Sequence, residues 1–347
     1  MRAVFAARVG GDDPLANLEV GDVDEAQLRP GWAMVRFAMG SLNHHDIWTL
    51  RGVSATPIVP PHVLGCDVAG TLLGYYENEP PEQLPAIGSP VVVHGVVRCG
   101  HCAACRGEEG APCRTARLFS ETPVAGTFSD QVIVPAGNLV PLPESVSFDA
   151  AACLPTAYLT AYHMLFARAA LRPGMTVLVQ GVSGGVASAA ILLANIAGIT
   201  VFATSRDEPK RGLALELGAT EAFPPERETA RALIARTDGL GVDAVIETVG
   251  EPTWELSLRA VRPGGTVVVA GATGGMNPPA ELNRIYYRNV TVAGSSMGTL
   301  AELRRLVELC AQGRLQPLIG SRHPMENADD AFREMVAGEL RGKVLLV

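Results

Sequence analysis

Residues 177–187 read Val177-Leu178-Val179-Gln180-Gly181-Val182-Ser183-Gly184-Gly185-Val186-Ala187. An apolar run ends there in a glycine-rich turn, and a helical stretch follows. Glycines let a backbone approach a pyrophosphate closely, and a helix N-terminus offers N–H donors and the positive end of a dipole. The spacing is G-x-x-G-G, and Ala187 stands where a third glycine is usual. By itself, the turn fits either a dinucleotide site or a tight β–α turn without a ligand.

The sequence around this turn alternates runs of strand length with helical stretches. The predicted order is strand Thr176–Gln180, helix Gly185–Ala197, strand Thr200–Thr204, helix Pro209–Leu217, strand Ala244–Glu247, helix Trp254–Ala260 and strand Thr266–Ala270. This alternation indicates a parallel sheet with right-handed crossovers. A strand before the turn, a helix after it and a second strand at the right distance favour the dinucleotide interpretation.

The first 155 residues follow a different pattern, in which short β-rich segments are separated by Pro and Gly. They include predicted strands at Ala33–Phe37, Ser89–His94 and Phe128–Val134, and a predicted edge strand at Met1–Arg8. Beyond the alternating region we expect helices at Leu300–Gln312 and Ala328–Ala337, then a strand at Gly342–Val347 that returns to the first domain. A chain of 347 residues exceeds the roughly 250–300 residues that one core serves. The predicted domains are residues 1–156 with 297–347, and residues 157–296.

Composition excludes several classes of protein. Hydrophobic residues make up 48% and charged residues 18%, which favours packed cores over disorder. A net charge of −8 without any run of Lys or Arg argues against nucleic-acid binding. The most apolar stretch, Ala189–Phe202, is interrupted by Asn195 and Gly198 and is too short to span a membrane. Met1–Arg8 is too short and too charged for a signal peptide, so we expect a cytoplasmic protein.

Four of the seven cysteines form a separate cluster. Cys99, Cys102, Cys105 and Cys113 follow the pattern C-x2-C-x2-C-x7-C. Four thiolates in one loop close a tetrahedral shell around a structural zinc, which would fold a lobe at residues 98–114. An iron–sulfur cluster is the rival, but its bacterial run has three residues before a final Cys-Pro. The odd total and the three scattered cysteines argue against a disulfide framework and favour a reducing compartment.

The end of the second strand indicates which dinucleotide binds. A site for NAD places a carboxylate there for the ribose 2′-hydroxyl, whereas this chain has Ser205 followed by Arg206 and Lys210. A small hydroxyl with two cations suits a 2′-phosphate, so the sequence favours NADP(H). The alternative is that both cations belong to a solvated helix N-terminus.

Taken together, the glycine turn and the cysteine lobe resemble the medium-chain dehydrogenase/reductase superfamily over essentially the whole chain. Further matching stretches are Leu42–Asp46, Leu64–Gly70, Leu159–Tyr162 and Gly342–Val344. The resemblance implies an α/β fold, with a GroES-like β-rich catalytic domain and a Rossmann domain with a doubly wound parallel sheet. It also implies a homodimer through the edge strand Val290–Ala293.

Members of this superfamily differ in whether they bind a catalytic zinc. Its zinc-type alcohol dehydrogenases carry Cys where Asn43 stands, His-Glu where Cys66-Asp67 stand, and Cys at the position aligned with Thr156. Asn43 and Thr156 rarely bind zinc, so this chain resembles the quinone-oxidoreductase side, which works without that metal. We therefore expect hydride transfer from NADPH to an activated carbonyl, quinone or enone, a small-molecule substrate. The alternatives are an alcohol dehydrogenase with an altered zinc shell around Cys66, and an NADPH-binding sensor or structural protein without turnover.

Without a zinc ion, hydrogen-bond donors must stabilise the charge that develops on the substrate oxygen. The resemblance makes Asn43, His45, Asp46 and Tyr158 the candidate catalytic residues. Asp46 could orient His44 or His45, or it could cap a helix that begins near Ile47. Tyr158 could reach the pocket, or it could be packed in the core.

The resemblance also implies a set of cofactor contacts, with Lys343 near the phosphates. They are His44, Thr160, Gly181, Ser183, Gly184, Gly185, Val186, Ser205, Arg206, Lys210, Thr248, Val249, Gly271, Ala272, Ser295, Ser296 and Lys343.

Overall fold

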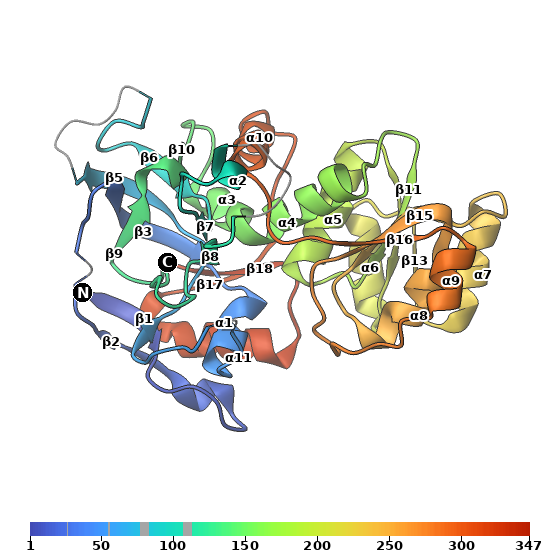
Figure 1. Cartoon of the computed structure of the whole chain (residues 1–347), viewed down its shortest axis with the longest axis horizontal. Coiled ribbons are helices and arrows are strands. Elements are labelled where there is room, and N and C mark those ends of the chain that lie inside the picture. The colour runs from blue at the N-terminus through green and yellow to red at the C-terminus, as the bar shows by residue number, and fades with distance from the viewer. Residues whose placement is uncertain (26, 55, 77–82, 107–112) are drawn as a thin grey trace. The chain divides into compact units, whose positions relative to one another are not determined.

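The computed structural model describes residues 1–347 except 26, 55, 77–82 and 107–112. The chain divides into two compact units (Figure 1). Unit 1 comprises Met1–Thr156 and Leu303–Val347, and unit 2 comprises Ala157–Glu302. Among the residues that the structure describes, no helix is long and apolar enough to cross a membrane.

Unit 2 is built on a six-stranded parallel sheet in the order β13-β12-β11-β14-β15-β16. Its strands are β11 (Thr176–Gln180), β12 (Thr200–Thr204), β13 (Glu221–Phe223), β14 (Val242–Glu247), β15 (Val261–Val269) and β16 (Thr291–Gly294). Its helices are α4 (Leu159–Tyr162), α5 (Gly185–Ile196), α6 (Glu208–Glu216), α7 (Arg227–Arg236), α8 (Glu251–Ala260) and α9 (Leu282–Tyr287). Short π-helical turns at Leu154–Tyr158 and His163–Arg168 flank α4.

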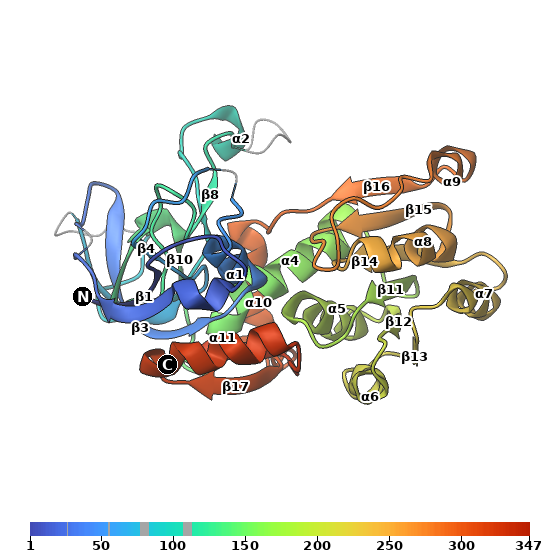
Figure 2. The ribbon, with the colours of Figure 1, turned by 90° about the horizontal axis from the view of Figure 1, so that it is seen from below.

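The path of the chain explains how the helices of unit 2 cover the sheet. From β11 the chain moves outward to β12 and β13, then crosses to β14 and continues to β15 and β16. Because each crossover is right-handed, the reversal places α5 and α6 on one face and α7 and α8 on the other (Figure 2). The reversal lies between β11 and β14, where the carboxyl ends of the strands open a crevice for a ligand.

Unit 1 is rich in short strands. They are β1 (Arg2–Ala6), β2 (Leu18–Asp22), β3 (Trp32–Ser41), β4 (His62–Val63), β5 (Ala69–Tyr75), β6 (Pro90–Val93), β7 (Val96–Val97), β8 (Arg117–Leu118), β9 (Gln131–Pro135), β10 (Leu139–Pro141), β17 (Ile319–His323) and β18 (Lys343–Leu346). The helices are α1 (His44–Leu50), α2 (Ala103–Arg106), α3 (Phe148–Cys153) and α11 (Ala328–Ala337), with α10 (Leu300–Ala311) beginning at the boundary of the units.

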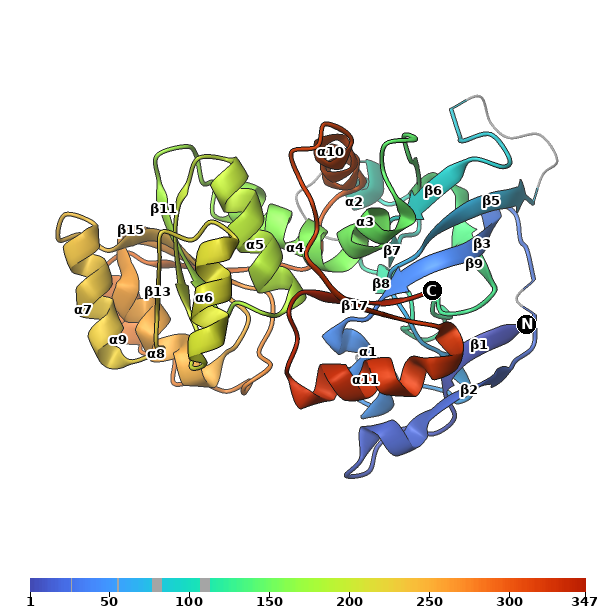
Figure 3. The same ribbon diagram turned by 180° about the vertical axis from the view of Figure 1, so that it is seen from behind.

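The strands of unit 1 form one large sheet and two small ones. The seven-stranded sheet has the order β10-β6-β5-β3-β18-β17, with β9 also paired to β3. The last strand, β18, lies antiparallel to β3, and α11 packs against β17 and β18 (Figure 3). The small sheets are β2-β1-β4 and β7-β8.

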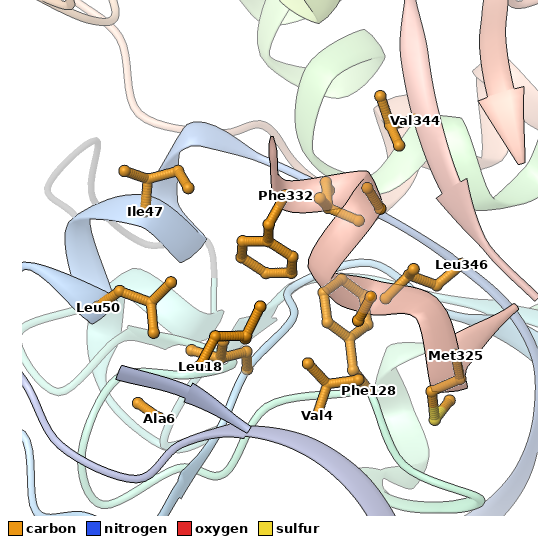
Figure 4. Packing of buried hydrophobic residues seen from close by; sticks show 14 residues of the cluster. Val4, Ala6, Leu18, Ile47, Leu50, Phe128, Met325, Phe332, Val344 and Leu346 are labelled. Carbon is orange, nitrogen blue, oxygen red and sulfur yellow. The ribbon is translucent and has the colours of Figure 1, made fainter. Parts of the chain in front are cut away.

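A hydrophobic core joins the two ends of the chain in unit 1. Figure 4 shows Phe332 of α11 and Phe128 among side chains of α1, β1 and β18. Both phenylalanines are fully buried. The prediction of an edge strand at Met1–Arg8 is wrong, because β1 pairs with β2 on one side and β4 on the other. Its residues 3–6 are buried on both faces, a pattern that belongs to a central strand.

The predicted helices and strands around the glycine turn are confirmed. Strands β11 and β12 have the predicted bounds, and α5 ends one residue earlier than predicted. α6, β14, α8 and β15 each begin earlier than predicted, by one to five residues. The pattern detected the buried centre of each element, whereas the first turns and strand ends carry weaker signals.

Candidate active site and zinc centre

The four clustered cysteines converge in the structure. The Sγ atoms of Cys99, Cys102, Cys105 and Cys113 all lie within 4.8 Å of one another. Hydrogen bonds from the Cys99 backbone and from Thr115 lower the pKa of the Cys113 thiol to about 5, which favours the thiolate that binds metal. Four sulfur ligands at this spacing fit a tetrahedral zinc. Residues 107–112 of the predicted lobe lie outside the described part of the chain.

The glycine turn has the backbone that a pyrophosphate requires. Gly181 has φ +84°, a left-handed conformation that favours glycine, and it ends β11. Gly184 is the N-cap of α5, and a Cβ added to it would meet no atom within 4 Å. The first N–H groups of α5 therefore border open space, and the end of the helix is suited to a phosphate.

The corner after β12 carries the predicted cations. Ser205 follows the strand directly, and Arg206 is exposed. The guanidinium of Arg211 donates to the carbonyl oxygens of Ser205 (2.8 Å) and Arg206 (3.2 Å), which fixes the loop. The sequence analysis did not predict a role for Arg211. The run of cations at Arg206, Lys210 and Arg211 could have indicated one.

Several further cofactor candidates lie at the carboxyl ends of strands. Ser295 follows β16, and its buried Oγ has no hydrogen-bond partner among the described residues. Thr160 is buried, and its hydroxyl faces Met297 Sδ at 3.8 Å. An orphaned hydroxyl in the region expected to face the carboxamide fits a nicotinamide. Tyr158, a candidate acid, is fully buried at the start of unit 2.

A buried carboxylate organises the turn after β14. Glu247 is fully buried and accepts hydrogen bonds from the backbone of Val249 (2.8 Å) and Gly250 (3.0 Å). It also accepts from the hydroxyls of Thr253 (2.9 Å) and Ser257 (2.6 Å). The network continues from Ser257 to Gln180 and Thr204 at the ends of β11 and β12. The sequence analysis predicted Glu247 as the last residue of a strand and gave it no role. A carboxylate at the end of an apolar strand could have indicated its buried hydrogen-bond network.

In unit 1, a second buried carboxylate lies next in the chain to Cys66, in the segment aligned with His-Glu of the zinc-type enzymes. Asp67 is fully buried and accepts from Ser41 Oγ (2.6 Å), Asn43 Nδ2 (2.8 Å) and Thr156 Oγ1 (2.6 Å). The structure thus brings Asn43 and Thr156, two of the aligned positions, together on Asp67. However, the amide and the hydroxyl point hydrogen atoms at the carboxylate, so they act as donors there and not as metal ligands.

Lys343 completes this cluster, whereas the sequence placed it near the cofactor phosphates. Its buried ammonium donates to Leu42 O (2.6 Å) and Asn43 Oδ1 (2.7 Å), and it lies 3.7 Å from Asp67 Oδ2. The expected phosphate contact stays a prediction, and within unit 1 these hydrogen bonds hold the ammonium inside the cluster. An ammonium beside the Asp67 carboxylate disfavours a divalent cation there by charge repulsion.

Asp46 caps a helix and does not orient a histidine. Its carboxylate accepts from the backbone N–H of Asn43 (2.8 Å) and of Gly65 (3.0 Å). Asn43 is the N-cap of α1, so the predicted capping role is confirmed, although the helix begins at His44 and not near Ile47. Burial raises the pKa of Asp46 to about 7, opposed by those two hydrogen bonds.

The two histidines of α1 differ in their surroundings. His44 packs edge-on against Trp48, and burial, with Arg51 nearby, lowers its pKa. Burial also lowers the pKa of His45, whose Nε2 is buried and has no hydrogen-bond partner among the described residues. Of the candidate catalytic residues in unit 1, Asn43 and Asp46 are engaged by hydrogen bonds within the chain, whereas His45 Nε2 is buried without one among the described residues.

The donor set does not fit a catalytic zinc. Cys66 is buried, its Sγ donates to the carbonyl oxygen of Phe119 (3.4 Å), and burial raises its pKa well above the ordinary value. Within the described residues, the four clustered cysteines are the only group of three or more His, Cys, Asp or Glu side chains with metal-binding geometry. A zinc shell around Cys66 would have to form from a protonated thiol and from the Asp67 carboxylate, whose oxygens already accept hydrogen bonds from Ser41, Asn43 and Thr156.

Comparisons with known proteins agree with this arrangement. The alcohol dehydrogenase GroES-like domain matches residues 29–144, and the zinc-binding dehydrogenase domain matches residues 185–312. The quinone oxidoreductase of Mus musculus is 31% identical over 243 residues, which are 67% of this chain and 72% of that protein. The chain belongs to the medium-chain dehydrogenase/reductase superfamily.

Relatives in this superfamily include enzymes of several kinds. The crotonyl-CoA carboxylase/reductase of Cereibacter sphaeroides is 27% identical over 363 residues, covering 96% of this chain and 83% of that one. A crystal structure of an NAD-dependent alcohol dehydrogenase has a TM-score of 0.91 and 32% identity, covering 100% of this chain and 99% of the other. The chain is therefore an oxidoreductase with a GroES-like unit and a Rossmann unit, as the sequence predicts, and its residues suit zinc and a nicotinamide cofactor.

Proposed function

We propose that this enzyme transfers hydride from NADPH to an activated carbonyl, quinone or enone, with one structural zinc and no catalytic zinc. The observation that carries the proposal is the cluster around Asp67. Three protein donors and the Lys343 ammonium satisfy this carboxylate, so charge and hydrogen bonding are balanced without a metal ion. We propose the structural zinc at the four cysteines that converge near Cys99.

The choice of NADPH rests on the corner after β12. Arg206, which is exposed, follows Ser205 directly, the Arg211 guanidinium donates to the Ser205 carbonyl oxygen, and Lys210 is a third cation of the segment. The chain has Ser205 where a carboxylate would meet a ribose 2′-hydroxyl. A phosphate at that position would receive charge-assisted hydrogen bonds.

In the absence of a catalytic zinc, residues of the chain must stabilise the developing charge and supply the proton. When bound, NADPH supplies the hydride that reduces the electrophilic carbon. The substrate oxygen then gains charge, and of the candidate residues we propose His45, whose buried Nε2 has no hydrogen-bond partner among the described residues, as the group that hydrogen-bonds to that oxygen and supplies the proton. Neutral donors stabilise charge less than a metal does, so acceptors that spread their charge by conjugation are favoured.

We also propose a homodimer through the edge of the parallel sheet. Strand β16 is the last of its sheet and pairs only with β15 among the described strands. Val292 on this strand is 42% exposed, and Tyr287 of α9 is 85% exposed. An exposed apolar edge of this kind is usually covered by another chain. The seven free cysteines suit a reducing compartment, which supports the proposal of a cytoplasmic enzyme.

Measurements on the purified enzyme test the proposed function and the proposed dimer. Zinc analysis should give one zinc per chain, and two zincs would favour the alcohol dehydrogenase with an altered shell. Loss of NADPH absorbance should be fastest with 1,4-benzoquinone, cyclohex-2-en-1-one or cinnamaldehyde, compared with NADP+ reduction by ethanol or propan-2-ol. If NADPH binds tightly but no acceptor oxidises it, the sensor without turnover is favoured. Light scattering that gives a monomer would overturn the proposed dimer.

A further inference from the structure

Three neighbouring strands of unit 2 end in polar residues whose side chains are joined by hydrogen bonds. Gln180 ends β11, Thr204 ends β12 and Glu247 ends β14. The three strands are adjacent in the parallel sheet, so their carboxyl ends lie along one edge of it. Each of the three residues directly precedes a segment in which we expect cofactor contacts: the glycine turn, the corner after β12 and the turn after β14. Contacts among the three side chains therefore fix these segments relative to one another.

The hydrogen bonds lead from β12 to the carboxylate of Glu247. The Thr204 hydroxyl donates to Gln180 Oε1, and Gln180 Nε2 donates to Ser257 Oγ of α8 (2.9 Å). The Ser257 hydroxyl donates to Glu247 Oε2 (2.6 Å). These four residues form the Glu247 network, and each of them is exposed by 1% or less. Because they are closed to solvent, they act on a cofactor only through the backbone that follows them.

Glu247 is matched to the donors around it. An ionised carboxylate only accepts hydrogen bonds and offers about four positions for them. Two of its donors are the backbone N–H groups of Val249 (2.8 Å) and Gly250 (3.0 Å), and the others are the hydroxyls of Thr253 (2.9 Å) and Ser257 (2.6 Å). A buried carboxylate is costly unless donors satisfy it. The turn 248–250 is therefore held in the conformation that aims its N–H groups at Glu247.

The turn 248–250 also supports the loop that follows β15. The backbone N–H of Gly274 donates to Val249 O (2.7 Å), and a Cβ added to Gly250 would lie 2.2 Å from the carbonyl oxygen of Gly275. The segment 270–275 carries further expected cofactor contacts and lies against this turn. Four strand ends that we expect to face the dinucleotide are thus connected to Glu247, three of them through side chains and the fourth through the turn.

We propose that Glu247 is a positioning residue for the nicotinamide cofactor, because its carboxylate joins the ends of β11, β12 and β14 and the turn 248–250 into one preorganised site. The inference deepens the proposed function. It rests on a nicotinamide cofactor bound by unit 2, but not on the choice of NADPH or on the substrate. Segments that are already ordered lose less conformational freedom when a ligand binds. Loss of the network should therefore weaken NADPH and NADH alike, whereas loss of Arg206 should affect mainly the cofactor with a 2′-phosphate.

Variants at Glu247 test this role in fluorescence titrations of the zinc-loaded enzyme. Glu247→Leu has no acceptor for the turn and should raise Kd for both NADPH and NADH about 10- to 100-fold. Glu247→Gln keeps one oxygen for the N–H groups of Val249 and Gly250, and the Ser257 hydroxyl can turn to Thr253 O (3.0 Å). Glu247→Gln should therefore bind both cofactors within about threefold of the unaltered enzyme.

Ser257→Ala is a milder variant that leaves the carboxylate in place. It removes the link between Gln180 and Glu247 and should raise both Kd values about 3- to 10-fold. If Glu247→Leu does not fold, Ser257→Ala decides, and unchanged Kd values in this variant overturn the inference.

A carboxylate at the opposite ends of the same strands provides the matched control. Asp243, near the start of β14, accepts from Thr176 N (2.8 Å) at the start of β11 and from Arg262 Nε (2.8 Å) of β15. Asp243→Leu should also lower the urea midpoint, but should change neither Kd by more than about twofold. If Asp243→Leu weakens cofactor binding as much as Glu247→Leu does, the effect is one of general stability and the inference is overturned.

Hydrogen exchange of the cofactor-free enzyme gives a second readout. The N–H groups of Val249 and Gly250 should exchange at least about 10-fold faster in Glu247→Leu than in Glu247→Gln, because only the second variant keeps an acceptor for them. Equal exchange in the two variants overturns the inference.

The outcomes also separate this inference from the proposed function. Enone reduction by Glu247→Leu and Ser257→Ala with unchanged Kd for NADPH overturns the inference while the function stands. Binding of NADPH and NADH that Glu247→Leu weakens alike, without oxidation of NADPH by any acceptor, supports the inference and overturns the function. If the unaltered enzyme binds neither cofactor, both are overturned.

Discussion

Replacing Lys343 with Met should strongly destabilise unit 1. The ammonium lies 3.7 Å from Asp67 Oδ2, and both side chains are almost fully buried. At an effective dielectric constant of about 20, an ion pair at this distance is worth about 4 kcal/mol. Removing one partner of a buried pair commonly costs about 3–5 kcal/mol, because the other charge stays buried. Both routes give a loss of about 3–5 kcal/mol in the free energy of unfolding.

Urea denaturation of the zinc-loaded enzyme, followed by a probe in unit 1, measures this loss. The matched control is Arg314→Met, which removes an exposed cation from the same unit and should change stability by less than about 0.5 kcal/mol. The second variant, Asp67→Asn, removes the negative charge instead. Combined with Lys343→Met, it should restore about 1–3 kcal/mol relative to the sum of the single losses.

The double-mutant cycle decides whether Lys343 neutralises Asp67. If the losses of Lys343→Met and Asp67→Asn simply add, the two charges do not interact, and the claim that a protein cation balances the cluster is refuted. If Lys343→Met binds a second zinc without loss of stability, the cluster holds metal more readily than its donors suggest. A coupled pair with one zinc per chain supports the hydrogen-bonded cluster.

Three further predictions concern the zinc lobe, the cofactor and the response to pH. Cys113→Ser should lower bound zinc far below one per chain and speed proteolysis of the lobe, and full retention of zinc would contradict the four-thiolate site. Arg206→Ala should weaken NADPH binding about 10- to 100-fold in fluorescence titrations but NADH binding less than about twofold, so equal losses would refute the choice of cofactor. Because the pKa of Asp46 is raised to about 7, its contribution to stability is complete below about pH 4 and is lost as pH rises to about 7. Asp46→Asn should remove this fall, at most about 4 kcal/mol, from urea midpoints measured against pH, and parallel curves for both proteins would contradict the raised pKa.

The Rossmann unit could be predicted from sequence because its signals are local. The apolar run of β11 stops at Gly181, and α5 starts four residues later, so each boundary is coded by its own neighbours. The cysteine lobe is similar, since its ligands lie within fifteen residues of one another. Local patterns did not show that β1 is central, because pairing with β4 joins segments more than fifty residues apart.

The site in unit 1 could be predicted only in part for the same reason. Alignment with the superfamily brought the positions of Asn43, Cys66 and Thr156 together, but one hydrogen-bond partner of Asn43 is Lys343, which is 300 residues away. No pattern in the sequence assigns a buried ammonium to that position.

The balance of charges around Asp67 favours hydride acceptors that spread the developing negative charge over a conjugated system. Asp67 and Lys343 cancel one another, and Asp46, with a pKa of about 7, adds at most a partial negative charge. Unit 1 thus supplies no excess positive charge at this point, so a localised alkoxide would be poorly stabilised. Neutral donors such as His45 are sufficient when the charge is shared over a conjugated enone or quinone. If simple ketones were reduced as fast as enones of the same size, this balance of charges would not be what selects the substrate.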